Sequence, residues 1–166
     1  MTESGKKVLL GLGNLLYRDE GFGIHALHRM LGKAHMMAGI EFVDGGVLGL
    51  NLLPLVEECS HLLVLDAIDA EQSDNEIAEL VGEEIPLFAK NKLSEHQVGF
   101  QEVLGLARFL GKYPNHLHVI GVKPMDVTFG IGLSPSTAAL LPHVIERACS
   151  VLRQWQAFLP VGATTP

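Results

Sequence analysis

The 166-residue sequence has few cysteines, no run of lysine or arginine, and no apolar stretch long enough to cross a bilayer. Two distant cysteines do not make a disulfide framework, so we interpret Cys59 and Cys149, each in a helical pattern, as buried free thiols of a cytoplasmic protein. The formal net charge of −7 argues against nucleic acid and anionic membranes as partners. Nothing near the N-terminus has the features of a signal peptide.

The composition favours a compact folded chain. Hydrophobic residues make up 48% of the sequence and charged residues 19%, which suits an α/β core rather than disorder. At this length we expect residues 1–166 to form a single domain, with 159–166 as a disordered tail. Nothing in the sequence demands more than a monomer.

Strand-like apolar runs alternate with helix-like apolar periodicity along the chain. The predicted strands are residues 8–10, 40–44, 61–68, 76–81 and 116–122. The predicted helices are residues 22–31, 48–58, 99–110 and 134–158, the last with Ser134 as N-cap, Pro135 at its first position and a kink near Pro142. This order predicts an α/β fold, a three-layer sandwich in which helices cover both faces of a twisted, mostly parallel sheet of about five strands.

Three ionisable residues lie where ligands bind in such a sheet, at the carboxyl ends of the strands. Glu20 follows the first strand, Asp66 ends the continuously apolar third strand, and His96 lies in the loop before the third helix. Two carboxylates and an imidazole can bind zinc or nickel and leave coordination positions open. These residues also have local explanations. Asp19 would cap the helix that follows, and Glu20 would complement the dipole of that helix. Asp66 would accept hydrogen bonds from the backbone, and His96 would cap the start of the third helix.

Other candidate sites have less support. Leu16 stands where a dinucleotide fingerprint would have its third glycine, no G-x-S-x-G sequence occurs, and neither cysteine neighbours a base. His25 and His28 share a helix face, and His116 and His118 share a strand face, but neither pair has an evident third ligand. We interpret both pairs as surface histidines.

A family resemblance supports the three-residue site. The chain contains, in order, the segments GLGNLLYRDEGFGIHAL, EFVDGG, HLLVLDAID, LSEHQVGFQEVL and VIGVKP. Across about residues 8 to 155 it therefore resembles the nickel–iron hydrogenase maturation endopeptidases. The resemblance implies a protease that removes a short C-terminal extension from the hydrogenase large-subunit precursor after nickel insertion. It implies metal contact and catalysis by Glu20, Asp66 and His96, and substrate handling by Asp44-Gly45-Gly46. Val47 departs from the family, which often has threonine there.

We therefore expect an aspartyl-type or metal-dependent endopeptidase whose partner is the precursor, whose nickel comes with the substrate, and which needs no organic cofactor. Two alternatives stay open. A nickel-binding maturation chaperone would use the same site without proteolysis. A receiver-like phosphoacceptor domain would use Asp19-Glu20, Asp66 and Lys123-Pro124. In this sequence, however, too many residues separate the acidic pair from the first strand, and His96 would have no role.

Overall fold

The computed structural model describes residues 4–68, 76–82, 85 and 95–157, with the backbone alone for 95–98. The strands are β1 (Lys6–Leu12), β2 (Ile40–Gly46), β3 (Cys59–Ala67), β4 (Ile77–Val81) and β5 (His116–Val122). The α-helices are α1 (Phe22–Leu31), α2 (Leu53–Glu58), α3 (Glu95–Phe109), α4 (Pro135–Ala138) and α5 (Leu141–Ala157). Short 3-10 helices among the described residues include η1 (Arg18–Gly21), η2 (Ala34–Met36) and η3 (Gly49–Leu52).

The five strands form one sheet in the order β2-β1-β3-β5-β4. Strands β1, β2, β3 and β5 run parallel, and β4 pairs antiparallel with β5 at one edge. The predicted mostly parallel α/β sandwich is confirmed. The predicted strands recur, and 116–122 matches β5 at both ends.

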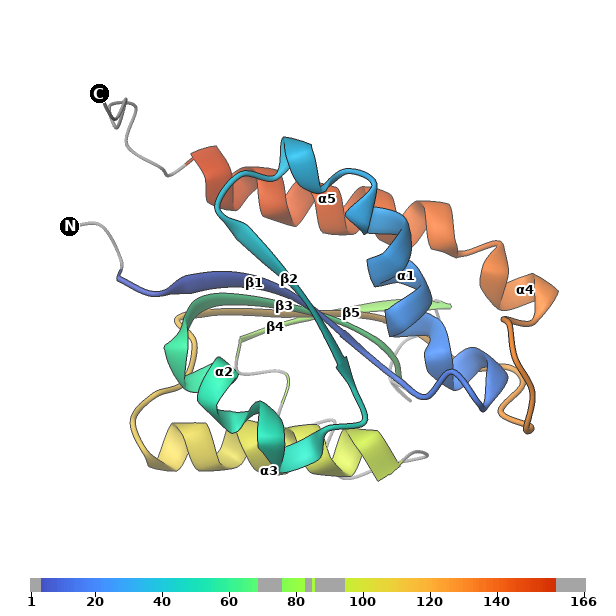
Figure 1. Ribbon diagram of the computed structural model, residues 1–166, viewed down its shortest axis with the longest axis horizontal. Helices are drawn as coiled ribbons and strands as arrows, with labels where there is room; N and C mark the ends of the chain where they lie inside the picture. Colours follow the sequence, from blue (N-terminus) through green and yellow to red (C-terminus); the bar gives the residue numbers. More distant parts are fainter. Residues whose placement is uncertain (1–3, 69–75, 83–84, 86–94, 158–166) are drawn as a thin grey trace.

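Helices cover both faces of the sheet (Figure 1): α1 and α5 lie on one side, and α2 and α3 on the other. Side chains of a strand point alternately to the two faces. In β3, Leu63 and Leu65 pack in the core under α1 and α5, whereas Leu62 and Val64 pack in the core under α2 and α3. By the same alternation, Asp66 belongs to the face that α2 and α3 cover.

Several expectations about helices were wrong. The helix expected over 134–158 is two helices, since α4 ends at Ala138 and α5 begins at Leu141. Ser134 does stand at the N-cap position of α4 with Pro135 directly after it, as expected, although its hydroxyl donates to Asp19 instead of capping the helix. Residues 48–58 form η3 followed by α2. At the end of α1, Leu31 is 48% exposed, whereas Met30 is buried.

Both cysteines are buried and free, as expected. Cys59 nevertheless begins β3, so its assignment to a helical pattern was wrong, whereas Cys149 does lie in α5. The tail expected at 159–166 lies outside the described residues. Among the described helices, none is both long and apolar enough to cross a membrane.

Candidate active site

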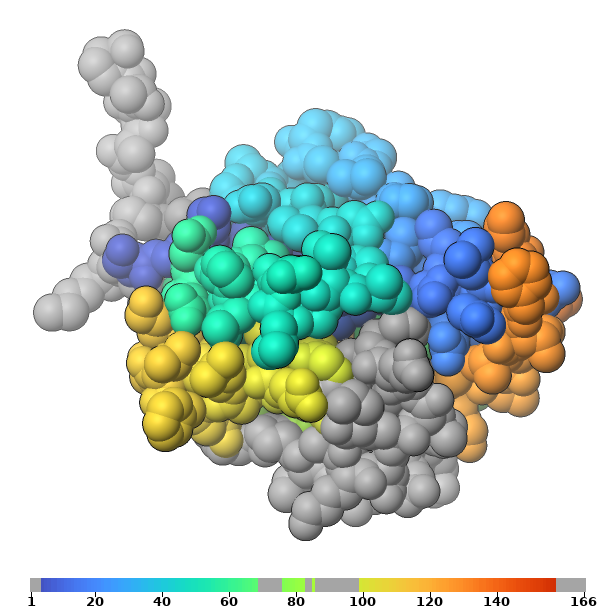
Figure 2. All heavy atoms as spheres, turned by 60° about the horizontal axis from the view of Figure 1, so that its bottom comes forward, coloured from blue at the N-terminus to red at the C-terminus, as the bar shows by residue number. Residues whose placement is uncertain are grey.

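Four parallel strands end at the same edge of the sheet, and the segments that follow them surround that edge. The segment after β1 leads into η1, the segment after β2 leads into η3, and the β5–α4 loop (residues 123–134) leads into α4. Figure 2 shows the blue residues around η1 between the orange β5–α4 loop and the teal residues after β2. The sheet therefore brings together segments that are far apart in the sequence.

Asp66 lies at this edge, one residue before the end of β3, and only 4% of its surface is exposed. Burial raises the pKa of its carboxyl group, a hydrogen bond of 2.8 Å from the Ala67 N–H to Oδ1 lowers it, and the nearby charge of Glu20 raises it, so that the pKa is about 7. A buried carboxylate without a cation is costly to ionise. Asp66 is thus well suited to bind a cation.

Glu20 is half-buried in η1, and close backbone packing fixes its position. The Asn14 N–H donates to the Glu20 carbonyl at 3.1 Å. Gly13 has a φ of +145°, and a Cβ there would collide with the same carbonyl. A Cβ at Gly23 would collide with the Leu65 carbonyl of β3. Gly13 therefore lets the segment after β1 lie against η1, and Gly23 lets the start of α1 lie against β3, which brings Glu20 within electrostatic reach of Asp66.

His96 lies in the first turn of α3, so its expected place in a loop was wrong. Helix α3 precedes β5, which runs parallel to β3, and a helix that connects parallel strands runs antiparallel to them and begins at their carboxyl ends. A Cβ at Gly99 would lie 3.3 Å from the Gly49 Cα, so the start of α3 is beside η3. The backbone of His96 thus lies at the same edge and on the same face as Asp66, while its side chain is outside the described residues.

The structure therefore brings Glu20 and Asp66 together and carries the backbone of His96 to the same edge. Within the described part of the chain, no group of three or more histidine, cysteine, aspartate or glutamate side chains could hold a metal ion. The two carboxylates are the described portion of the expected three-residue site.

Asp44 lies at the end of β2 and is exposed. Its Oδ1 accepts a hydrogen bond of 3.0 Å from the Gly46 N–H, and its Oδ2 lies 3.7 Å from Nε2 of His28. Gly13 donates its N–H to the Gly46 carbonyl at 3.1 Å, which joins this segment to the one before η1. Val47 is 58% exposed at the same edge. Of the Asp44-Gly45-Gly46 segment, Asp44 is thus accessible at the same edge as the two carboxylates, whereas Gly45 is buried and Gly46 is partly exposed.

The remaining histidines do not complete a cation site among the described residues. His28 is exposed, but His25 is only partly exposed, and burial lowers its pKa. His116 is exposed and stacks on His61 with ring centroids 4.2 Å apart, whereas His118 is partly buried. The interpretation as surface histidines was therefore wrong for His25 and His118, and right for His28 and His116.

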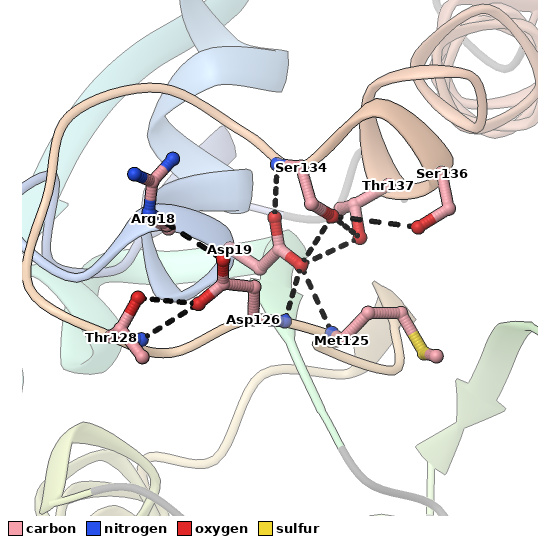
Figure 3. A network of polar contacts seen from close by, with 8 residues as sticks. All are labelled: Arg18, Asp19, Met125, Asp126, Thr128, Ser134, Ser136 and Thr137. Atoms are coloured by element: carbon pink, nitrogen blue, oxygen red, sulfur yellow. Dashed lines mark hydrogen bonds and ion pairs between the residues drawn. The ribbon is translucent and has the colours of Figure 1, made fainter.

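The alternative local explanation for Asp19, a cap on α1, was wrong, because the residue before α1 is Gly21 and makes no side-chain cap. Asp19 is completely buried and accepts five hydrogen bonds, shown in Figure 3. Burial alone would raise its pKa, but the donors of Ser134, Asp126 and Thr137 outweigh burial and hold the pKa below its usual value. These donors lie more than 100 residues away, so no local pattern could have revealed them.

Comparison with known proteins identifies the family. A family model described as hydrogenase maturation protease matches residues 24–151 of this chain. This chain belongs to the hydrogenase maturation protease family.

Individual proteins similar to this chain align with it over nearly its whole length. A hydrogenase expression/formation protein, HupD, of Rhizobium leguminosarum bv. viciae is 38% identical, covering 96% of this chain and 81% of that protein. The hydrogenase 2 maturation protease of Escherichia coli K12 is 32% identical, covering 89% of this chain and 90% of that protein. The structure of the hydrogenase maturating endopeptidase HybD from E. coli superposes with a TM-score of 0.81 at 31% identity, covering 90% and 93%. The hydrogenase maturation protease described here is therefore a peptidase with the fold of HybD.

Proposed function

We propose that this peptidase removes the C-terminal extension of a nickel–iron hydrogenase large-subunit precursor after nickel insertion, and that Glu20, Asp66 and His96 contact the nickel of the substrate. The observation that carries the proposal is the buried Asp66 carboxylate beside Glu20. Burial and the neighbouring negative charge both disfavour the ionised form of Asp66, and a bound cation would offset both effects.

Nickel in this proposal is part of the substrate. A site that always held metal would cleave every precursor, whereas a site completed only by the nickel of a docked precursor would make cleavage depend on metal loading. The carboxylates of Glu20 and Asp66 would complete the coordination of that nickel and hold the scissile bond close to it, which is a gain from positioning. The bound nickel would either polarise the scissile carbonyl or activate a water molecule. Asp44, exposed at the same edge, would contact the polypeptide beside the bond.

The test uses nickel-loaded precursor and four proteins: the wild type, Glu20→Gln, Asp66→Asn and His96→Ala. We expect each substitution to lower kcat/KM by at least about 100-fold, because each removes a contact to the metal. Loss of the C-terminal peptide is followed by mass spectrometry. Glu41→Gln and His35→Ala serve as matched controls and should cleave normally, because both residues are exposed at the opposite edge of the sheet, where β2 begins.

Normal cleavage by the Glu20→Gln or Asp66→Asn variant would refute the assignment of the site. If the wild type binds nickel-loaded precursor without cleaving it, a chaperone role without proteolysis would replace the proposed reaction.

A further inference from the structure

The β5–α4 loop exposes apolar side chains next to the candidate active site. Phe129 and Ile131 are 75% and 80% exposed, and Met125 and Val127 are also exposed. Within the described residues, most of the large apolar side chains that face solvent belong to this loop or to the segments after β1 and β2. A concentration of exposed apolar groups on one part of a protein marks an interaction surface.

The tip of this loop is held against the segment after β1. The Gly130 N–H donates to the Leu16 carbonyl at 2.8 Å, and the Arg18 N–H donates to the Gly130 carbonyl at 3.0 Å. The rings of Tyr17 and Phe129 meet edge to face with centroids 6.0 Å apart. Phe129 is therefore presented by a backbone that neighbouring residues fix in place.

The carboxylate of Asp19 holds the two ends of the same loop (Figure 3). At the start of the loop, the backbone N–H groups of Met125 and Asp126 each donate to Oδ2 at 2.9 Å. At its end, the Ser134 N–H donates to Oδ1 at 2.7 Å, and the hydroxyls of Ser134 and Thr137 donate to Oδ2 at 2.8 Å. One buried side chain thus fixes where the loop leaves β5 and where it enters α4.

The tip of the loop is uncharged. Residues 127–133 contain no charged side chain. The carboxylate of Asp126, just before the tip, accepts hydrogen bonds from Thr128 and lies 3.5 Å from Nε of Arg18. A surface that is apolar and neutral matches apolar side chains of a partner rather than a charged segment.

We propose that Asp19 is a positioning residue, which holds Glu20 at the reacting bond and the β5–α4 loop beside it, and that Phe129 and Ile131 contact apolar side chains of the precursor next to the bond that is cleaved. Three consecutive residues support this proposal. Arg18 contacts the tip of the loop, Asp19 contacts the two ends of the loop, and Glu20 lies within electrostatic reach of Asp66. The proposal rests on the proposed function, because it assumes that the polypeptide over Glu20 is the precursor.

The contact by Phe129 is tested with steady-state cleavage of nickel-loaded precursor. We expect Phe129→Ala to raise KM about tenfold and leave kcat nearly unchanged, because the lost contact is present before and during the reaction. Phe109→Ala is the matched control: Phe109 is 85% exposed at the last residue of α3, far from the start of that helix, and its loss should change neither constant. Equal KM values for the two variants would overturn the contact.

The role of Asp19 is tested with Asp19→Asn, which keeps the size of the side chain but turns an N–H group toward an N–H donor. We expect kcat to fall about 100-fold while the protein stays folded, because Glu20 is displaced. Amide hydrogen exchange at Met125, Asp126 and Ser134 should accelerate at least about tenfold, with the protection of β1 and β3 unchanged. If the folded variant has the kcat of the wild type and the same amide hydrogen exchange rates at these three residues, the proposal is overturned.

The double variant Ser134→Ala/Thr137→Ala is used if Asp19→Asn does not fold. It removes two hydroxyl donors and leaves the three backbone donors, so the same exchange should accelerate to a smaller extent, and unchanged exchange would overturn the proposal. Failure of the wild type to cleave would refute the proposed function instead, and the exchange measurements would still decide whether Asp19 holds the loop.

Discussion

Asp66 should make the metal-free protein less stable at neutral pH than its Asp66→Asn variant. Its pKa is about 7 in the folded protein and 3.8 in an ordinary environment. Below about pH 3.8 the carboxyl is protonated in both states, so it imposes no cost. Between the two values only the unfolded chain ionises, so the free energy of unfolding falls as the pH rises, and above about pH 7 the full cost is present.

The size of the cost follows from the shift. A difference of about 3 pKa units corresponds to about 4 kcal/mol at 1.36 kcal/mol per unit. The asparagine side chain of the variant would keep an acceptor for the Ala67 N–H and would never ionise. The variant should therefore gain about 4 kcal/mol relative to the wild type between about pH 4 and about pH 8.

The assay is urea unfolding of both proteins at five values from about pH 4 to about pH 8, with a chelator present. Glu146→Gln, which removes an exposed carboxylate on α5, is the control and should stay within about 0.5 kcal/mol of the wild type. A difference between Asp66→Asn and the wild type that does not change with pH would refute the argument that burial keeps this carboxyl protonated.

Three further predictions concern other parts of the same structure. Glu20→Gln should lower the pKa of Asp66, because the charge of Glu20 raises it, and a carboxyl carbon titration by NMR that gives an unchanged pKa would contradict this. Gly23→Ala should lower the free energy of unfolding by about 3 kcal/mol, because the added Cβ meets backbone carbonyls of β1 and β3, and an unchanged urea midpoint would contradict this. Cys59, whose pKa burial raises to about 12, and buried Cys149 should react with a thiol reagent at about pH 8 only after unfolding, so rapid labelling of the folded protein would disprove their inert state.

The sheet was predictable because its signal is local. Strand β3 is buried at every position from Cys59 to Ala67, and strand β5 is buried from Val119 to Val122, so each contains a continuous apolar run in the sequence. The alternation of such runs with helical periodicity then predicts the parallel order. Helix boundaries were less predictable. The break between α4 and α5, and the start of α3 at Glu95 instead of residue 99, depend on packing between elements. The spacing of apolar residues in the sequence does not reveal such packing.

The candidate site divides in the same way. Asp66 could be found because a carboxylate in an apolar strand is conspicuous, and Glu20 because the D-E-G-x-G segment follows a strand. The role of Asp19 could not be found, since Met125 and Ser134 approach it only when the β5–α4 loop folds back on η1. The local sequence offered a helix cap as one explanation for Asp19, but its carboxylate instead accepts hydrogen bonds from residues distant in the sequence.

In the proposed reaction, nickel carried by the precursor binds at Glu20 and Asp66 and thereby permits cleavage of the precursor. The most direct measurement compares the same large-subunit precursor with and without nickel, incubated with the wild-type protein and analysed by mass spectrometry for loss of the C-terminal peptide. We expect cleavage of the nickel-loaded precursor alone, and none by the Asp66→Asn variant. Equal cleavage of the nickel-free precursor would show that nickel does not control the reaction.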